Sequence, residues 1–161
     1  MPEQVLSIIH NLKKGKSFGR WDVYNVAVTD QRCIFALLTA DMLKEATKLA
    51  NEQGKAEGKG FFDRWGDQIK ISLFYGEKYR TWAPENILSE NPANFAIAHA
   101  ELIKVQFKQK HSIQDKGALF RRILGEVTFE TTRGKYAFES DGFPENDIAD
   151  MRRYLGDRVK S

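Results

Sequence analysis

The sequence predicts a single α+β domain, spanning residues 1–161, in which a helical segment interrupts a sheet and a C-terminal helix closes it. Strand-like patterns, either rich in aromatic and β-branched residues or alternating apolar with polar, occupy about residues 20–38 and about 95–138. Helical patterns occupy about residues 40–92 and the C-terminus. A chain of 161 residues can bury a sizeable core without a metal or a disulfide.

The first expected element is a helix over about residues 3–14. The apolar residues of this segment share one helical face and are Val5, Leu6, Ile8, Ile9 and Leu12. Gly15 is a natural residue for the end of such a helix.

A β-hairpin is expected next. Residues 20–28 are rich in Trp, Tyr and Val, and Thr29-Asp30-Gln31 has the composition of a turn. Residues 32–38 form a short apolar run, which predicts a strand buried on both faces.

The middle of the chain is expected to be helical. One amphipathic helix runs from about Met42 to Gly54, and the glycine-rich, charged residues 54–60 predict a mobile link. Residues 61–82 fit both a strand and a helix, and we favour the helix. Pro84 is placed to begin a further short helix.

The C-terminal part predicts strands followed by a helix. Ile103, Val105 and Phe107 alternate with polar residues, as in a strand with one buried and one wet face. Thr132-Arg133-Gly134 predicts the turn of a second hairpin. Pro144 should open a final helix whose apolar stripe is Ile148, Met151, Leu155 and Val159.

Three of these features together resemble bacterial pleckstrin-homology-like (PH-like) domains. They are the hairpin with Thr29-Asp30-Gln31-Arg32 at its turn, the strand over 101–105, and the hairpin over 132–138 before the last helix. The resemblance covers about residues 18–38 and 95–160. It implies a strongly bent antiparallel sheet or partly open barrel, capped by the C-terminal helix, with residues 40–92 as a helical insertion.

The pattern of reactive residues argues against an enzyme. Cys33, the one cysteine, lies in an apolar run, which favours a buried thiol and a reducing, cytoplasmic location. His10, His99 and His111 lie in separate segments without metal-ligand spacing, so no metal or cofactor site is expected. Gly15-Lys16-Ser17 lacks the first glycine and the preceding strand of a nucleotide-binding P-loop.

A group of basic residues is the first candidate binding surface. Lys104, Lys108 and Lys110 recur on one face of the strand expected from Ile103, with Arg121 and Arg122 shortly after them. Such a face would suit an anionic membrane or an acidic partner. The alternative is that the lysines only protect an exposed sheet edge from aggregation.

An aromatic group supplies the second candidate, at a membrane interface. Phe61, Phe62 and Trp65 follow the expected link and have basic neighbours. The alternative is that these rings pack on the sheet.

From these features we expect a non-catalytic interaction module that binds a protein partner, itself or an anionic membrane surface. The net charge of +3 is mild, which makes nucleic acid a less favoured partner. The alternative function is nucleic-acid binding through the basic strand face, with stacking from exposed aromatic residues.

Overall fold

The structure is a computed structural model that describes residues 2–15, 20–56, 75–114 and 121–160. In these ranges eight strands form one open sheet in the order β4-β3-β2-β1-β7-β6-β5-β8. The strands are β1 (Val5–Gly15), β2 (Trp21–Thr29), β3 (Arg32–Leu38), β4 (Phe95–Ala98), β5 (Leu102–Gln114), β6 (Arg121–Thr131), β7 (Gly134–Pro144) and β8 (Val159–Lys160). The pairing is antiparallel except between β5 and β8, so the sheet is mixed and the expected α+β class is confirmed.

The sheet bends where β1 meets β7. Within the described residues these two strands pair at Leu12–Ser140 and Lys13–Glu139, a much shorter ladder than those on either side. The bend brings β3 against β6 and β7, since the Phe35 ring packs 5.1 Å from that of Phe129 and 5.4 Å from that of Phe138. The main hydrophobic core therefore lies inside the bend.

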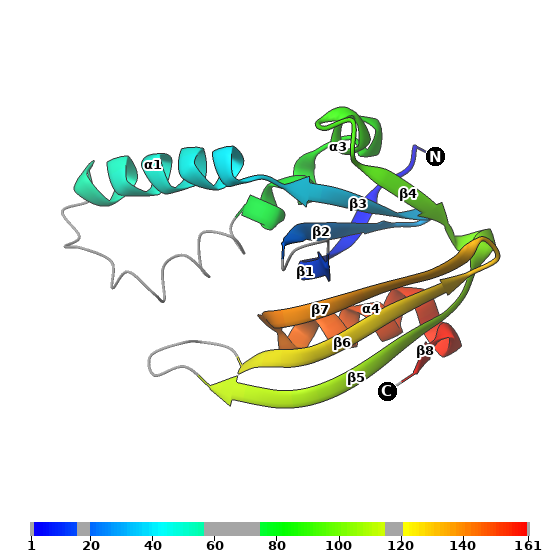
Figure 1. Cartoon of the computed structure of the whole chain (residues 1–161). Coiled ribbons are helices and arrows are strands. Elements are labelled where there is room, and N and C mark those ends of the chain that lie inside the picture. Colours follow the sequence, from blue (N-terminus) through cyan, green and yellow to red (C-terminus); the bar gives the residue numbers. More distant parts are fainter. Residues whose placement is uncertain (1, 16–19, 57–74, 115–120, 161) are drawn as a thin grey trace.

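Helices cover the sheet on two different sides. Helix α4 (Glu145–Leu155) closes the main core (Figure 1) with Met151 and Leu155. The 3₁₀ helix η2 (Lys78–Thr81) and helix α3 (Pro84–Ser89) cover the opposite face of the strands β1 to β3. There they form a second core from Ile8, Ala27, Ile34, Ala36, Tyr79 and Ile87.

The prediction of a helix over residues 3–14 is wrong, because this segment forms the strand β1. Ile8 and Ile9 point to opposite faces, one into the second core and one into the main core. Register shifts between Val5 and Ser7 and between Ile9 and Leu12 place residues three apart on the same face. These bulges reproduce the spacing of an amphipathic helix, and Asn11 takes φ 58° at the second one.

Both expected hairpins are confirmed and their turns are built alike. The hydroxyl of Thr29 accepts the backbone N–H of Arg32 (2.9 Å) and donates to its carbonyl oxygen (3.0 Å). Thr131 likewise donates to the carbonyl oxygen of Gly134 (2.9 Å) and accepts the N–H of Arg133 (3.1 Å). The strand β3 is buried on both faces, as its apolar run predicts.

The helical elements of residues 40–92 lie in the connection between the neighbouring strands β3 and β4. Helix α1 (Ala40–Ala56) continues past Gly54, where we expected it to end, and extends away from the sheet (Figure 1). Pro84 begins α3 as expected. The remainder of the expected link, and residues 61–74 of the ambiguous segment, lie outside the described residues.

Two expectations for the C-terminal part are corrected. Ile103 is 53% exposed and Leu102 is buried in its place, because a bulge between Leu102 and Lys104 reverses the alternation there. Val159 lies in β8 rather than in the last helix, since α4 ends at Leu155 and Gly156 follows with φ 65°. Short 3₁₀ turns, η3 (His99–Glu101) and η4 (Gly156–Arg158), precede β5 and β8.

Candidate functional site

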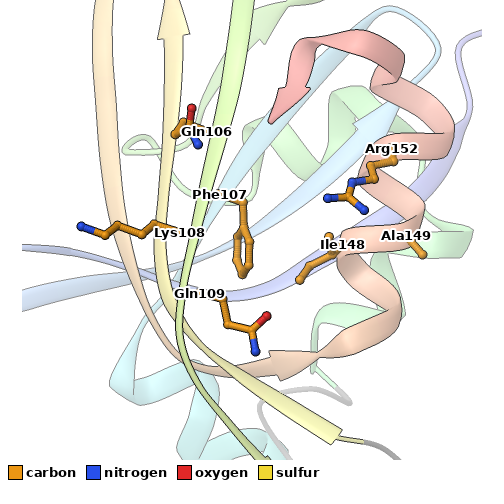
Figure 2. Close-up of a pocket in the computed structure, with 7 residues that line it drawn as sticks. All are labelled: Gln106, Phe107, Lys108, Gln109, Ile148, Ala149 and Arg152. Atoms are coloured by element: carbon orange, nitrogen blue, oxygen red, sulfur yellow. The ribbon is translucent and has the colours of Figure 1, made fainter. Parts of the chain in front are cut away.

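A cavity of about 860 Å³ lies between β5 and α4. In Figure 2 the Phe107 ring lies between the strand and the helix, and Ile148 points toward it. Arg152 extends into the same space from α4, whereas Lys108 points away from the helix. The lining residues are Gln106, Phe107, Lys108, Gln109, Ile148, Ala149 and Arg152.

The alternation of side chains along β5 and the helical repeat of α4 place the lining residues of the cavity. Val105 and Phe107 alternate with Gln106 and Lys108, so the apolar side chains of β5 face α4. On α4, Met151 and Leu155 point into the core, while the half-buried Ile148 sits at the margin of that stripe. The cavity is thus the margin of the main core, with an apolar floor and a polar rim.

The cavity borders an edge of the sheet. Strand β8 pairs with β5 at Val105–Val159 and Gln106–Lys160. Within the described residues, β5 continues to Gln114 with a partner on its β6 side alone. In the described ranges this stretch of β5 is therefore a sheet edge to which a further strand could add.

The basic face predicted from the sequence lies on β5, on the side away from α4. Lys104 is 3.9 Å from Glu130 and Lys110 is 2.9 Å from Glu126, both across the β5–β6 ladder. The hydrogen bond to Glu126 raises the pKa of Lys110, and it lowers the pKa of Glu126. The sequence alone does not show these acids opposite the lysines, because it does not give the register of β6.

The other predicted site residues are less fully described. Arg121 and Arg122 lie in β6, opposite Gln114 and Ile113, but their side chains fall outside the described part of the structure. Phe61, Phe62 and Trp65 also lie outside the described residues. The membrane-interface prediction for these three rings therefore stays a prediction.

A buried ionic cluster is the feature that the sequence analysis missed. His10 on β1 is 2.9 Å from Asp147 of α4 through Nδ1, and Nε2 is 2.9 Å from Oε1 of Glu77, just before η2. The backbone N–H of His10 also donates to Asp147, at 2.8 Å. Gly76 permits the approach of Glu77, because a Cβ atom there would lie 2.9 Å from the His10 ring. The cluster ties β1, the insertion and α4 together.

The cluster keeps His10 charged. Burial alone would lower the pKa of His10, but the contacts with Asp147 and Glu77 outweigh it and raise that pKa to about 9. The close contact with His10, and then that with Arg80, lowers the pKa of Glu77 to about 2. Burial raises the pKa of Asp147 against the opposing effect of His10. Since both ring nitrogens face carboxylates, this imidazolium is suited to holding elements together rather than to accepting a proton.

Other reactive groups fit structural roles. Cys33 is buried, and burial raises the pKa of its thiol to about 12. In the part of the chain that the structure describes, no group of three or more His, Cys, Asp or Glu side chains is arranged so that it could hold a metal ion. In the same ranges no helix combines the length and the hydropathy needed to cross a bilayer.

Comparison with models of protein families, with curated proteins and with solved structures gives no match for this chain. A candidate function therefore has to come from the geometry of the site itself.

Proposed function

We propose that the chain is a non-catalytic interaction module that binds an extended, acidic segment of a protein partner along β5, beside α4. The observation that carries the proposal is a cavity of about 860 Å³ at a sheet edge that β8 covers only at Val105 and Gln106 within the described residues. Main-chain pairing to a strand edge supplies affinity, and a pocket beside it supplies selectivity for a side chain.

The charge of the rim favours an acidic segment. Lys108 and Arg152 border the cavity, and none of its described lining residues carries a carboxylate. Of these two, Arg152 extends into the cavity, whereas Lys108 points away from α4 and lies opposite Glu126 in the β5–β6 ladder. The formal charges among the described lining residues are therefore all positive, which favours an acidic partner.

The floor of the cavity favours one apolar side chain. Phe107 and Ile148 form this floor, and Figure 2 shows them pointing toward one another. An extended peptide presents alternate side chains to one side, so an apolar residue can enter the cavity while its neighbours face water. The expected ligand is therefore an acidic strand with an aliphatic residue at the cavity.

Fluorescence anisotropy with a labelled peptide of alternating Glu and Val residues tests the proposal. Ala149→Glu places a carboxylate on the exposed rim of the cavity, on α4, where it repels an acidic peptide. We expect binding to weaken by about tenfold or more, which corresponds to about 1.4 kcal/mol of binding free energy or more. Ala137→Glu is the matched control, because Ala137 is exposed on β7 and gives the same change in net charge. Equal effects of the two variants would contradict the proposed site.

Three other partners are outcomes of the same test. Anionic vesicles, single-stranded RNA and the unlabelled protein itself are assayed beside the peptide. If the wild-type protein binds one of these but not the peptide, and Ala149→Glu leaves that binding unchanged, then the cavity between β5 and α4 is not the binding site.

A further inference from the structure

An aromatic cage surrounds the ammonium group of Lys78 on the side of the sheet opposite to α4. The Lys78 Nζ lies 3.7 Å from the ring centroid of Tyr75, 4.4 Å from that of Trp82 and 5.1 Å from that of Tyr79. Oε2 of Glu90 lies 2.7 Å from the same nitrogen. Three π faces and one carboxylate thus meet at a single cationic position.

The cage walls are held in place by the fold. Tyr79 is buried in the second core, its hydroxyl is hydrogen-bonded to Glu90, and its ring stands at 87° to that of Trp82. Tyr75 and Tyr79 are also edge to face, at 75°. Perpendicular rings of this kind present separate faces to one point in space, which is the geometry of a cation-binding cage.

The cage is open to solvent at the position of the lysine. The side chain of Lys78 is 27% exposed, and Tyr75 and Trp82 are only partly buried. Lys78 belongs to the same stretch of chain as the three rings, so it can leave the cage by rotating its side chain without moving the walls.

We propose that this cage is a binding site for an alkylammonium group with one or two N-methyl groups, as on a methylated lysine side chain of a partner, and that Lys78 occupies it in the unliganded protein. The site is separate from the groove between β5 and α4 and does not depend on its function. Lys78 acts as an internal competitor for the site.

The cage walls and Glu90 determine which methylation state of a lysine side chain binds best. An unmodified lysine matches Lys78 in chemistry and cannot displace it, because an attached competitor has a high effective concentration. A methylated ammonium is less strongly hydrated and covers more of the ring faces. Glu90 accepts a hydrogen bond at the cation, which a trimethylated nitrogen cannot donate. The expected order is therefore dimethyl above trimethyl above unmodified.

The first experiment observes Lys78 in the wild-type protein by NMR. Ring currents from the cage should shift its ε-methylene protons upfield in the unliganded protein. Millimolar acetyl-dimethyllysine-amide should move them back toward the usual position, and the unmodified lysine amide should not. Unmoved Lys78 resonances, or equal effects of the two amides, would overturn the proposal.

The second experiment empties the cage. Lys78→Ala removes the internal competitor, so the cage is empty in every molecule. This variant should bind the dimethyllysine amide about tenfold tighter than the wild type, in which Lys78 fills the cage most of the time. Trp82→Leu added to Lys78→Ala should abolish the gain, while Lys135→Ala, an exposed lysine on β7, should bind like wild type. No gain in a folded Lys78→Ala variant, or an undiminished gain without Trp82, would overturn the proposal. If Lys78→Ala does not fold, the wild-type NMR titration decides.

Discussion

The two halves of the sheet differ in how many of their faces are covered. Strands β1 to β3 lie between the main core and the insertion, so adjacent residues such as Ile8 and Ile9 are both fully buried. Strands β5 to β7 have a core on the α4 side, while the other side carries Lys104, Glu126 and Glu130. The second half therefore has one face packed in a core and one face of exposed charged side chains.

Two ion pairs of the same length show what this difference means for stability. His10–Asp147 and Lys110–Glu126 both measure 2.9 Å. The first pair is 3% and 4% exposed, whereas the second is 50% and 42% exposed. Water screens the second pair, so equal distances do not imply equal contributions to folding.

The largest expected effect comes from breaking the buried pair. Asp147→Ala leaves the His10 cation and its backbone N–H without their buried partner and should cost about 3–5 kcal/mol. The matched control, Glu126→Ala, removes an exposed, water-screened partner and should lower the free energy of unfolding far less. Urea unfolding of both variants measures the difference. Similar losses would show that the two halves do not differ as described.

The packing of α4 should be nearly as important. Leu155 is 3% exposed in the main core, so Leu155→Ala should lower the free energy of unfolding by about 2–5 kcal/mol. Ile103→Ala is the control, because Ile103 is 53% exposed on the open half and should lose less than about 1 kcal/mol. A loss near zero for Leu155→Ala in thermal or urea unfolding would mean that α4 is not docked.

The buried half should also dominate the pH dependence of stability. The pKa of His10 is raised from 6.5 to about 9, so its contribution is complete below about pH 6.5 and is lost as the pH rises through 9. The groups that face it are Asp147 of α4 and Glu77 of the insertion, and these two carboxylates are in turn influenced by Asp150 and Arg80. The decline should amount to about 3 kcal/mol, at 1.36 kcal/mol for each pKa unit.

Urea midpoints measured between pH 6 and pH 10 test this decline. His10→Gln, which cannot titrate, should remove most of it. A slope that persists in that variant would assign the decline to other groups.

The smallest effect on stability is expected at the lysines on the face of β5 that points away from α4. Replacing Lys104, Lys108 and Lys110 by Glu places like charges across from Glu126 and Glu130, which should lower stability only slightly because water screens these exposed groups. Binding of the acidic peptide should fall more than stability, since the charge beside the groove changes sign. A melting curve measured beside the anisotropy titration separates the two effects.

Where the sequence predicted well, local pattern and tertiary environment agree. Residues 32–38 read as a strand buried on both faces, and β3 is one, because two cores meet at it. Ile148, Met151 and Leu155 have helical spacing and face the sheet. Thr29 and Thr131 have turn chemistry and close both hairpins.

Where the sequence misled, a bulge changed the period. Two bulges in β1 give Val5, Ile8, Ile9 and Leu12 the spacing of a helix, and a third puts Ile103 into solvent. The cluster of His10, Glu77 and Asp147 joins residues far apart in the chain, so no local pattern could reveal it. The groove depends on the register of β8 against β5, and Val159 was predicted to be helical.

Amide hydrogen exchange with and without the acidic peptide tests most directly whether the open half is the binding half. The proposed strand addition predicts slower exchange for those β5 amides in residues 107–114 whose N–H groups point away from β6, where β8 no longer pairs. The other sheet edge, β4, should exchange at an unchanged rate. Protection confined to β4 or to the insertion, with β5 unchanged at saturating peptide, would contradict the account.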